Sequence, residues 1–331
     1  MTKKSIQFNR RQLLTGAATL AVAPWLIEGQ IQASHAKAPM LGPKQPKHAR
    51  FKLGEFELTN IVDSESFIDG PYPLIGKNAT EQEVRTLMQQ HFLPETKYQP
   101  GFTPTVLNTG KELILFDTGN GDNGFIPEPA GGWLAKQLLP AGIKPEQIDI
   151  VVLTHGHPDH VGGLIMHGKT IYPNARYIIS QIEYDFWTAK NKHSGDIEKF
   201  AKVFIDNTQS LKDKFTFIKP GDDVVTGVTA VEAYGHTPGQ MAFHIESAGN
   251  QAFLWADCAH HHVASLARPD WHCVFDVDPE QGAKTRARIF DMVATDKLTV
   301  LGYHMPFPSI GYVEKLNGQS FRWVQHSFQL K

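Results

Sequence analysis

The segment HGHPDH at residues 155–160 places three histidines and one aspartate within six positions. It follows a largely apolar run, 148–153, which predicts a buried strand. Neutral imidazoles and carboxylates are the ligands that borderline-soft divalent cations such as zinc prefer. An extended turn after the strand would point the first two histidines to one side and the aspartate and third histidine to the other. We therefore expect two adjacent metal ions, with a solvated His-rich loop as the alternative.

The N-terminal residues have the order of an export signal. Four basic residues precede an uncharged stretch at 13–27, and small residues suited to cleavage follow at 34–36. The pair Arg10-Arg11 resembles the twin-arginine signal. Because a glycine and a proline interrupt the apolar stretch, a permanent membrane span is the weaker alternative.

The predicted organisation is a twin-arginine signal peptide over 1–36, a linker or N-terminal arm over 37–50 and one folded domain over 51–331. Export would make the protein periplasmic or secreted, with the twin-arginine export machinery as a partner and no stable membrane span after cleavage. Whether the signal is cleaved or kept as an N-terminal anchor stays open.

Composition limits the remaining classes. A formal net charge of −2 provides no basic field, so nucleic acid is not an expected partner. An apolar fraction of 41% with 20 Phe and 6 Trp is ample for a sizeable core. The two cysteines, Cys258 and Cys273, exclude a disulfide framework but leave a single bridge between them open.

Hairpins alternate with helices along the chain. Paired strands are predicted over 105–116 and around Asn317-Gly318, and helices around 133–139, 196–211 and 279–294. This mixture favours stacked mixed sheets covered by helices over a purely parallel sheet.

Polar residues follow three predicted strands of the second half. His236 lies in a glycine-rich turn after 228–233, Asp257 follows 252–256 and His304 follows 298–302. Loops at strand ends are where a rigid scaffold places functional side chains. A helix cap is the alternative for Asp257, and His304 competes with several other histidines. We expect the triple histidine at 260–262 to form an exposed polar loop, with contact to substrate or water near Asp257 as the alternative.

Together these motifs resemble the metallo-β-lactamase superfamily over nearly all of residues 51–331. The resemblance implies a four-layer αββα sandwich (α/β class) with the site along one edge of its paired sheets. It also implies two divalent metal ions, zinc first, with manganese, cobalt or iron as alternatives. The implied ligands are His155, His157 and His236 for one ion and Asp159, His160 and His304 for the other, with Asp257 bridging and Asp117 orienting a ligand histidine.

The resemblance implies a hydrolase that uses a metal-bridging hydroxide, with Asp257 and Asp159 handling protons. Shorter matches at 159–164 and 307–311 resemble exported enzymes of the methyl parathion hydrolase and lactonase type. They imply a small-molecule substrate (an ester, lactone or phosphotriester) in an apolar pocket walled by Trp187 and Phe125.

Two alternatives from other classes remain. One is an iron-dependent oxidoreductase of the persulfide dioxygenase type, and the other is a non-catalytic exported metal-binding protein. The natural substrate and the oligomeric state stay open, with a homodimer as one alternative.

Overall fold

The computed structural model describes residues 40, 42, 45–189 and 193–327. The chain divides into two units, Met1–Lys44 and Gln45–Lys331, and the second unit carries the fold described here. The predicted signal peptide, 1–36, lies outside the described residues. Strand β1 begins at His48, inside the range predicted as an arm (37–50), so regular structure starts three residues earlier than expected. Among the described helices, none combines the length and apolar character that a membrane crossing requires.

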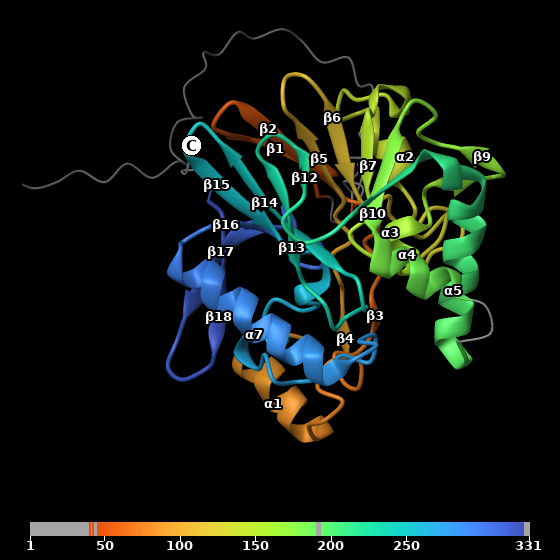
Figure 1. Ribbon diagram of the computed structural model, residues 1–331. Coiled ribbons are helices and arrows are strands. Elements are labelled where there is room, and N and C mark those ends of the chain that lie inside the picture. The colour runs from red at the N-terminus through yellow and green to blue at the C-terminus, as the bar shows by residue number, and fades with distance from the viewer. Residues whose placement is uncertain (1–39, 41, 43–44, 190–192, 328–331) are drawn as a thin grey trace, which may run out of the picture. The chain divides into compact units, whose positions relative to one another are not determined.

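Two seven-stranded sheets form the centre of the second unit (Figure 1). The first sheet has, in spatial order, β1 (His48–Leu53), β2 (Phe56–Ile61), β5 (Thr105–Asn108), β6 (Leu113–Phe116), β7 (Ile150–Val152), β10 (Arg176–Ser180) and β11 (Phe215–Ile218). The second has β12 (Asp223–Val225), β13 (Val228–Glu232), β14 (Met241–Ser247), β15 (Asn250–Leu254), β16 (Thr299–Leu301), β17 (Ile310–Lys315) and β18 (Phe321–Gln325). Each sheet contains parallel and antiparallel pairs, as the sequence predicted.

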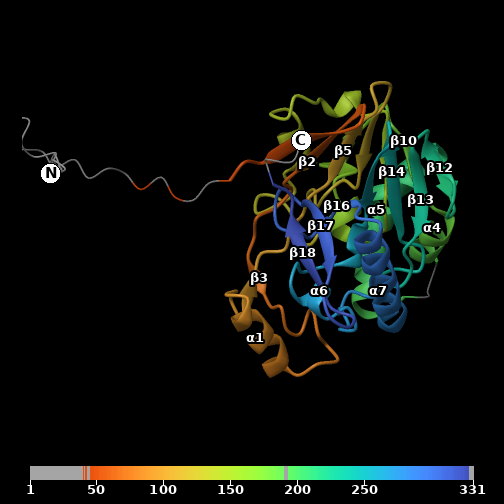
Figure 2. The same cartoon turned by 90° about the vertical axis from the view of Figure 1, so that its left-hand side faces the viewer.

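Helices lie on the outer faces of the sheets. Figure 1 shows α4 (Gln181–Thr188) and α5 (Gly195–Thr208) beside the first sheet and α7 (Pro279–Thr295) beside the second. The shorter helices are α1 (Glu81–Gln90), α2 (Leu134–Leu138), α3 (Pro158–Val161) and α6 (Ala264–Ala267), with 3₁₀ turns at Pro145–Gln147, Gln209–Lys214 and Ala256–Cys258. Two small ribbons, β3 (Ile68–Asp69) with β4 (Lys97–Tyr98) and β8 (Ile165–Met166) with β9 (Lys169–Thr170), complete the elements. Figure 2 shows α1 and β3 set apart from both sheets.

Three apolar layers separate these elements. One lies between the first sheet and α4 and α5, one between the two sheets, and one between the second sheet and α7. Leu115 belongs to the first layer, whereas its neighbours Ile114 and Phe116 belong to the middle one. Because successive strand side chains point to opposite faces, each strand supplies two layers. The order helix, sheet, sheet, helix confirms the predicted αββα sandwich.

The strands deliver the polar motifs to one place. β7, β13, β15 and β16 are followed, respectively, by the segments that carry HGHPDH, His236, Asp257 and His304. The turn after β7 differs from the prediction of an extended segment, because Pro158–Val161 forms the short helix α3. Proline at the first position of a helix fits this start, since its fixed φ suits the helix and its missing N–H is not needed there.

Candidate metal centre

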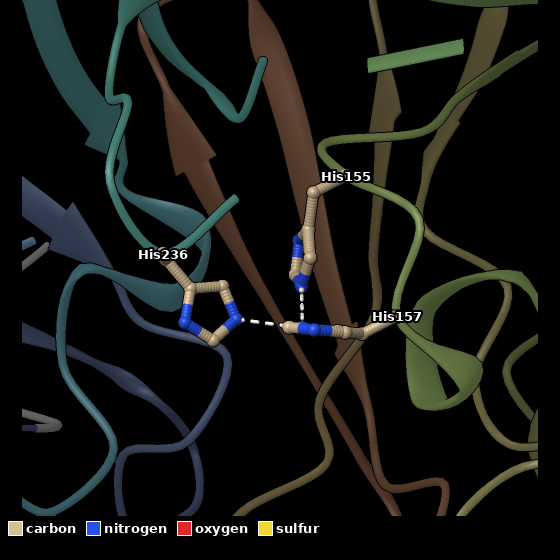
Figure 3. Close-up of side chains that lie close together, drawn as sticks. All are labelled: His155, His157 and His236. Carbon is tan, nitrogen blue, oxygen red and sulfur yellow. Dashed lines mark hydrogen bonds between the residues drawn. The ribbon is translucent and has the colours of Figure 1, made fainter. Parts of the chain in front are cut away.

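Three histidines converge from two loops. His155 and His157 follow β7, and His236 comes from the turn between β13 and β14 (Figure 3). His157 Nδ1 lies 3.1 Å from His155 Nε2 and 2.8 Å from His236 Nε2. All three rings are buried. We call these residues the imidazole cluster, and their facing nitrogens match the arrangement of a three-imidazole zinc site.

A second group lies beside the first. Its members come from α3, from the turn after β15 and from the loop after β16; they are Asp159, His160, Asp257 and His304, all buried, and we call them the mixed cluster. His160 Nε2 lies 3.3 Å from Asp159 Oδ2, and His304 Nε2 lies 3.0 Å from Asp257 Oδ2. The structure therefore brings together all seven residues that the sequence predicted as ligands.

Asp257 lies between the two clusters. Its Oδ1 is 3.2 Å from His160 Nε2, in the mixed cluster. Its Oδ2 is 3.0 Å from His304 Nε2, in the mixed cluster, and 3.4 Å from His236 Nε2 and 3.8 Å from His155 Nε2, in the imidazole cluster. A carboxylate has two acceptor oxygens, so it can serve one cation with each. This placement is what a bridging ligand requires.

Three of the ring nitrogens that face away from the clusters have carboxylate or carbonyl partners. His160 Nδ1 lies 2.8 Å from Asp117 Oδ2, and His236 Nδ1 lies 2.8 Å from Asp276 Oδ1. His304 Nδ1 donates to the Gly101 carbonyl at 2.6 Å. Such partners hold the proton on the remote nitrogen, so each Nε2 presents a lone pair to the cluster. Asp117 thus lies where the sequence predicted an orienting carboxylate.

Unsatisfied polar atoms test whether the clusters fit a cation. Within the described residues, His157 Nε2, His160 Nε2 and Asp257 Oδ1 are buried without a hydrogen-bond partner. Buried polar groups are normally paired, since an unpaired one costs about 1–3 kcal/mol. Two of these atoms face other ligand atoms inside the mixed cluster, where a cation would satisfy them. The donor set therefore fits two borderline-soft divalent ions.

The histidines of the two clusters differ in the direction in which their surroundings shift their pKa. Burial, followed by neighbouring histidines, lowers the pKa of His155 and of His157 well below the ordinary value, so both rings are neutral ligands. Burial also lowers the pKa of His160, but Asp257, Asp159 and Asp117 outweigh it and raise that pKa well above the ordinary value. The mixed cluster is thus the more anionic of the two.

An apolar cavity of about 230 Å³ opens onto both clusters. His157, Asp159, His236, Asp257 and His304 form part of its lining. The other lining residues are Ile68, Tyr98, Pro100, Phe102, Phe125, Ile126, His260 and Phe275. A concave, mainly apolar site with a few convergent polar groups is the usual form of a small-molecule site.

Of the two aromatic residues predicted to line the substrate pocket, only one lines the cavity. Phe125 lines the cavity, with its ring centroid 6.4 Å from that of His157. Trp187 does not line it, so that prediction is wrong. Its ring is 0% exposed, packs behind His157 at 5.4 Å and donates Nε1–H to Glu183 Oε1. A helix that covers a sheet turns its large apolar side chains into the core, and α4 does so here.

The triple histidine was also wrongly predicted as an exposed loop. His260 and His261 are 5% and 4% exposed, and His260 Nε2 lies 3.5 Å from Asp257 Oδ2. With His236 and Asp276, His260 forms a third group of residues that could hold a cation. Cys258 and Cys273 are both free and buried, which leaves no bridge between them.

Sequence reasoning missed two buried carboxylates that support the imidazole cluster. Asp276 accepts from His236 and from Arg286, whose Nη2 lies 3.1 Å away. Glu183, in the first turn of α4, accepts hydrogen bonds from both histidine loops. No local motif marks either residue, since Asp276 lies 40 positions from His236 in the chain and Glu183 lies 27 positions from Gly156; only the folded topology reveals them.

Comparisons with known proteins agree with this geometry. A model of the metallo-beta-lactamase superfamily matches residues 103–257. The dizinc quorum-quenching lactonase AidC, solved with N-hexanoyl-L-homoserine as product, superposes with a TM-score of 0.79 and 26% identity, covering 85% of this chain and 98% of that one. The hydrolase AbOPH gives the same TM-score and identity over 86% and 99% of the two chains.

A curated relative matches a smaller region. An uncharacterized protein of Caenorhabditis elegans is 28% identical over 125 residues, which span 37% of this chain and 32% of that protein. This chain therefore matches about a third of the length of that relative.

Proposed function

We propose that this chain is a metal-dependent hydrolase of the metallo-β-lactamase superfamily that hydrolyses an apolar lactone or ester with two divalent cations. The imidazole cluster would hold one cation and the mixed cluster the other. The observation that carries the proposal is the Asp257 carboxylate, whose oxygens lie within 3.8 Å of histidines from both clusters. Zinc is the first expectation, since imidazole and carboxylate ligands suit it.

The bound ions would lower the pKa of a coordinated water and polarise the substrate oxygen that gains charge. The protein supplies the rest. Asp257 and Asp159 lie at the cavity floor, where they can accept the proton of the attacking water and pass it to the leaving oxygen. The apolar walls exclude bulk water, which strengthens electrostatic interactions at the reacting atoms.

The cavity supports an apolar substrate body. Its walls above the clusters are mainly aromatic and aliphatic, with Phe102, Phe125 and Phe275 among them. The lactonase function printed for AidC supports a cyclic ester as the first substrate class. Open-chain aryl esters and phosphotriesters are the neighbouring alternatives, because all three present an electrophilic centre bearing a polarisable oxygen.

The test is a metal and substrate panel on the purified protein. The protein is stripped with a chelator, reloaded separately with zinc, manganese, cobalt or iron, and its metal content is measured. We expect two equivalents of zinc, loss of lactone hydrolysis on stripping and its recovery on reloading. A single iron with oxygen uptake would support a dioxygenase instead. Two bound ions with no turnover on lactone, aryl ester or phosphotriester would contradict a hydrolase for this substrate range.

A further inference from the structure

Glu183 joins the two loops of the imidazole cluster. Its side chain is 0% exposed and lies in the first turn of α4. Oε1 accepts from the Gly156 amide at 2.9 Å and from Trp187 Nε1, and Oε2 accepts from the Thr237 hydroxyl at 2.8 Å and the Gly239 amide at 2.9 Å. All four acceptor positions of the carboxylate are used.

Each oxygen serves a different half of the chain. Gly156 lies between His155 and His157, so Oε1 fixes the first histidine loop. Thr237 follows His236 directly, so Oε2 fixes the second. In Figure 3 these loops approach from opposite sides, and their imidazoles meet between them. The distance between the loops therefore depends in part on one buried side chain.

Two glycines allow this close approach. A Cβ on Gly156 would lie 2.3 Å from Trp187 Cδ1, and a Cβ on Gly239 would lie 2.3 Å from the Glu183 amide nitrogen. Real Cβ atoms do not come so near other atoms, so any side chain at either position would push its loop away from α4. Both loops thus lack a side chain at the point where they meet this helix.

The mixed cluster is held by other groups. Asp117 lies against His160, the Gly101 carbonyl accepts from His304, and the Tyr303 hydroxyl donates to the Asp159 carbonyl at 2.6 Å. In the described part of the chain, no hydrogen bond joins Glu183 to a member of this cluster. A change at Glu183 should therefore act on one cation site and spare the other.

We propose that Glu183 is a positioning residue that sets the spacing of the three imidazoles and thereby the cation affinity of the imidazole cluster. The inference rests on the proposed function, in which that cluster holds one of two ions. A buried acceptor with four donors fixes both loops before the cation arrives, so little ordering is left to oppose binding. Supporting groups of this kind typically change metal affinity by about 10–100-fold.

The test uses Glu183→Gln in two backgrounds that each leave one cation site. His304→Ala removes a ligand of the mixed cluster, and His236→Ala removes one of the imidazole cluster. The glutamine keeps the size of the side chain, but its NH₂ meets two donors that the carboxylate accepted. Zinc affinity is measured by competition with a chromophoric chelator. We expect about a tenfold or larger loss in the His304→Ala background and no change in the His236→Ala background.

A matched control is Asp63→Asn. Asp63 is likewise buried and joins separate segments, because it accepts from Asn120 and from the Leu134 amide. It contacts neither histidine loop through these bonds. We expect this variant to lower the melting temperature of the metal-free protein while leaving zinc affinity unchanged in both backgrounds.

The outcomes separate the two claims. If the wild-type protein binds fewer than two zinc ions, the proposed function fails. If it binds two, but Glu183→Gln weakens both sites equally or neither, the role of Glu183 is wrong. Should Glu183→Gln not fold, Thr237→Val removes a single donor to Oε2 and should weaken the same site by a smaller factor. Unchanged affinity in that variant would also overturn the inference.

Discussion

The imidazole cluster and the mixed cluster lie side by side but are stabilised differently. The first consists of three imidazole rings, and its supporting carboxyl groups, Asp276 and Glu183, lie behind the ligands. The second contains two carboxylates among its own members, Asp159 and Asp257. The affinity of the first should therefore depend on how precisely its loops are held, and that of the second on charge at the site itself. Variants that remove charge or alignment should distinguish them.

Removing Asp257 should have the largest effect, because this carboxylate faces both clusters. Its loss should weaken both cation sites and not one alone. For Asp257→Ala we expect fewer than two bound ions and a fall in kcat/KM of at least about a hundredfold, since two-ion charge stabilisation is worth several kcal/mol. Metal analysis and lactone hydrolysis measure both effects. His244→Ala, a histidine on β14 outside both clusters, is the control. Full turnover with two ions bound would rule out a bridging role.

Variants of Asp117 and Asp276, the carboxylates that orient ligand histidines, should affect the two clusters differently. Asp117 holds His160 of the mixed cluster, whereas Asp276 holds His236 of the imidazole cluster. We expect Asp276→Asn to weaken the ion of the imidazole cluster by about 10–100-fold and to leave the other unchanged. Asp117→Asn should weaken the ion of the mixed cluster by a similar factor and the other ion less, because Asp117 also accepts from the Thr154 amide and hydroxyl, and that hydroxyl lies 3.0 Å from His155 Nδ1. Stepwise zinc titration of each variant measures this. Asp276→Asn also leaves buried Arg286 without its charge partner, so the melting temperature should fall more than in Asp117→Asn. Identical binding profiles for the two variants would mean that the clusters are not independent.

The smallest expected effect is that of a change in the apolar wall of the cavity. Phe125 lines the cavity without contributing a ligand atom. We expect Phe125→Ala to raise KM for an apolar lactone roughly tenfold, which equals about 1.4 kcal/mol of lost apolar contact, with kcat and metal content nearly unchanged. Phe217→Ala, at a partly exposed position on β11, is the matched control. A fall in kcat without a change in KM would place Phe125 in the chemical step instead.

The ligands were predictable because each follows an apolar strand, and strand ends of stacked sheets gather at one edge. His236, Asp257 and His304 lie far apart in the sequence, yet their strands β13, β15 and β16 belong to one sheet. The bonds of Asp276 and Glu183 could not be predicted in this way. Glu183 meets its partners where α4 packs against two loops, and Asp276 meets His236 where two loops pack together, and a single sequence carries no periodic signal for either contact.

Three local features of the structure differ from the sequence predictions or are missing from them. Helix α1 was not predicted, although Thr80 and Glu83 form a capping box at its start. Trp187 was placed on the wrong side of its helix, because a short apolar segment does not show which face meets the core. The strand pair β3 and β4 has only two residues in each strand, too few to show an alternating pattern.

The small ribbon of β3 and β4 supplies Ile68 and Tyr98 to the cavity, and Phe102 follows close behind. All three precede the stretch that matches the superfamily, which begins at residue 103, and that stretch contains the HGHPDH segment. Part of the cavity wall therefore comes from chain outside the matched stretch, whereas Phe125 and Ile126 on the same wall lie within it. Substitutions between residues 68 and 102 can therefore reshape the cavity wall without changing any of the seven ligand residues.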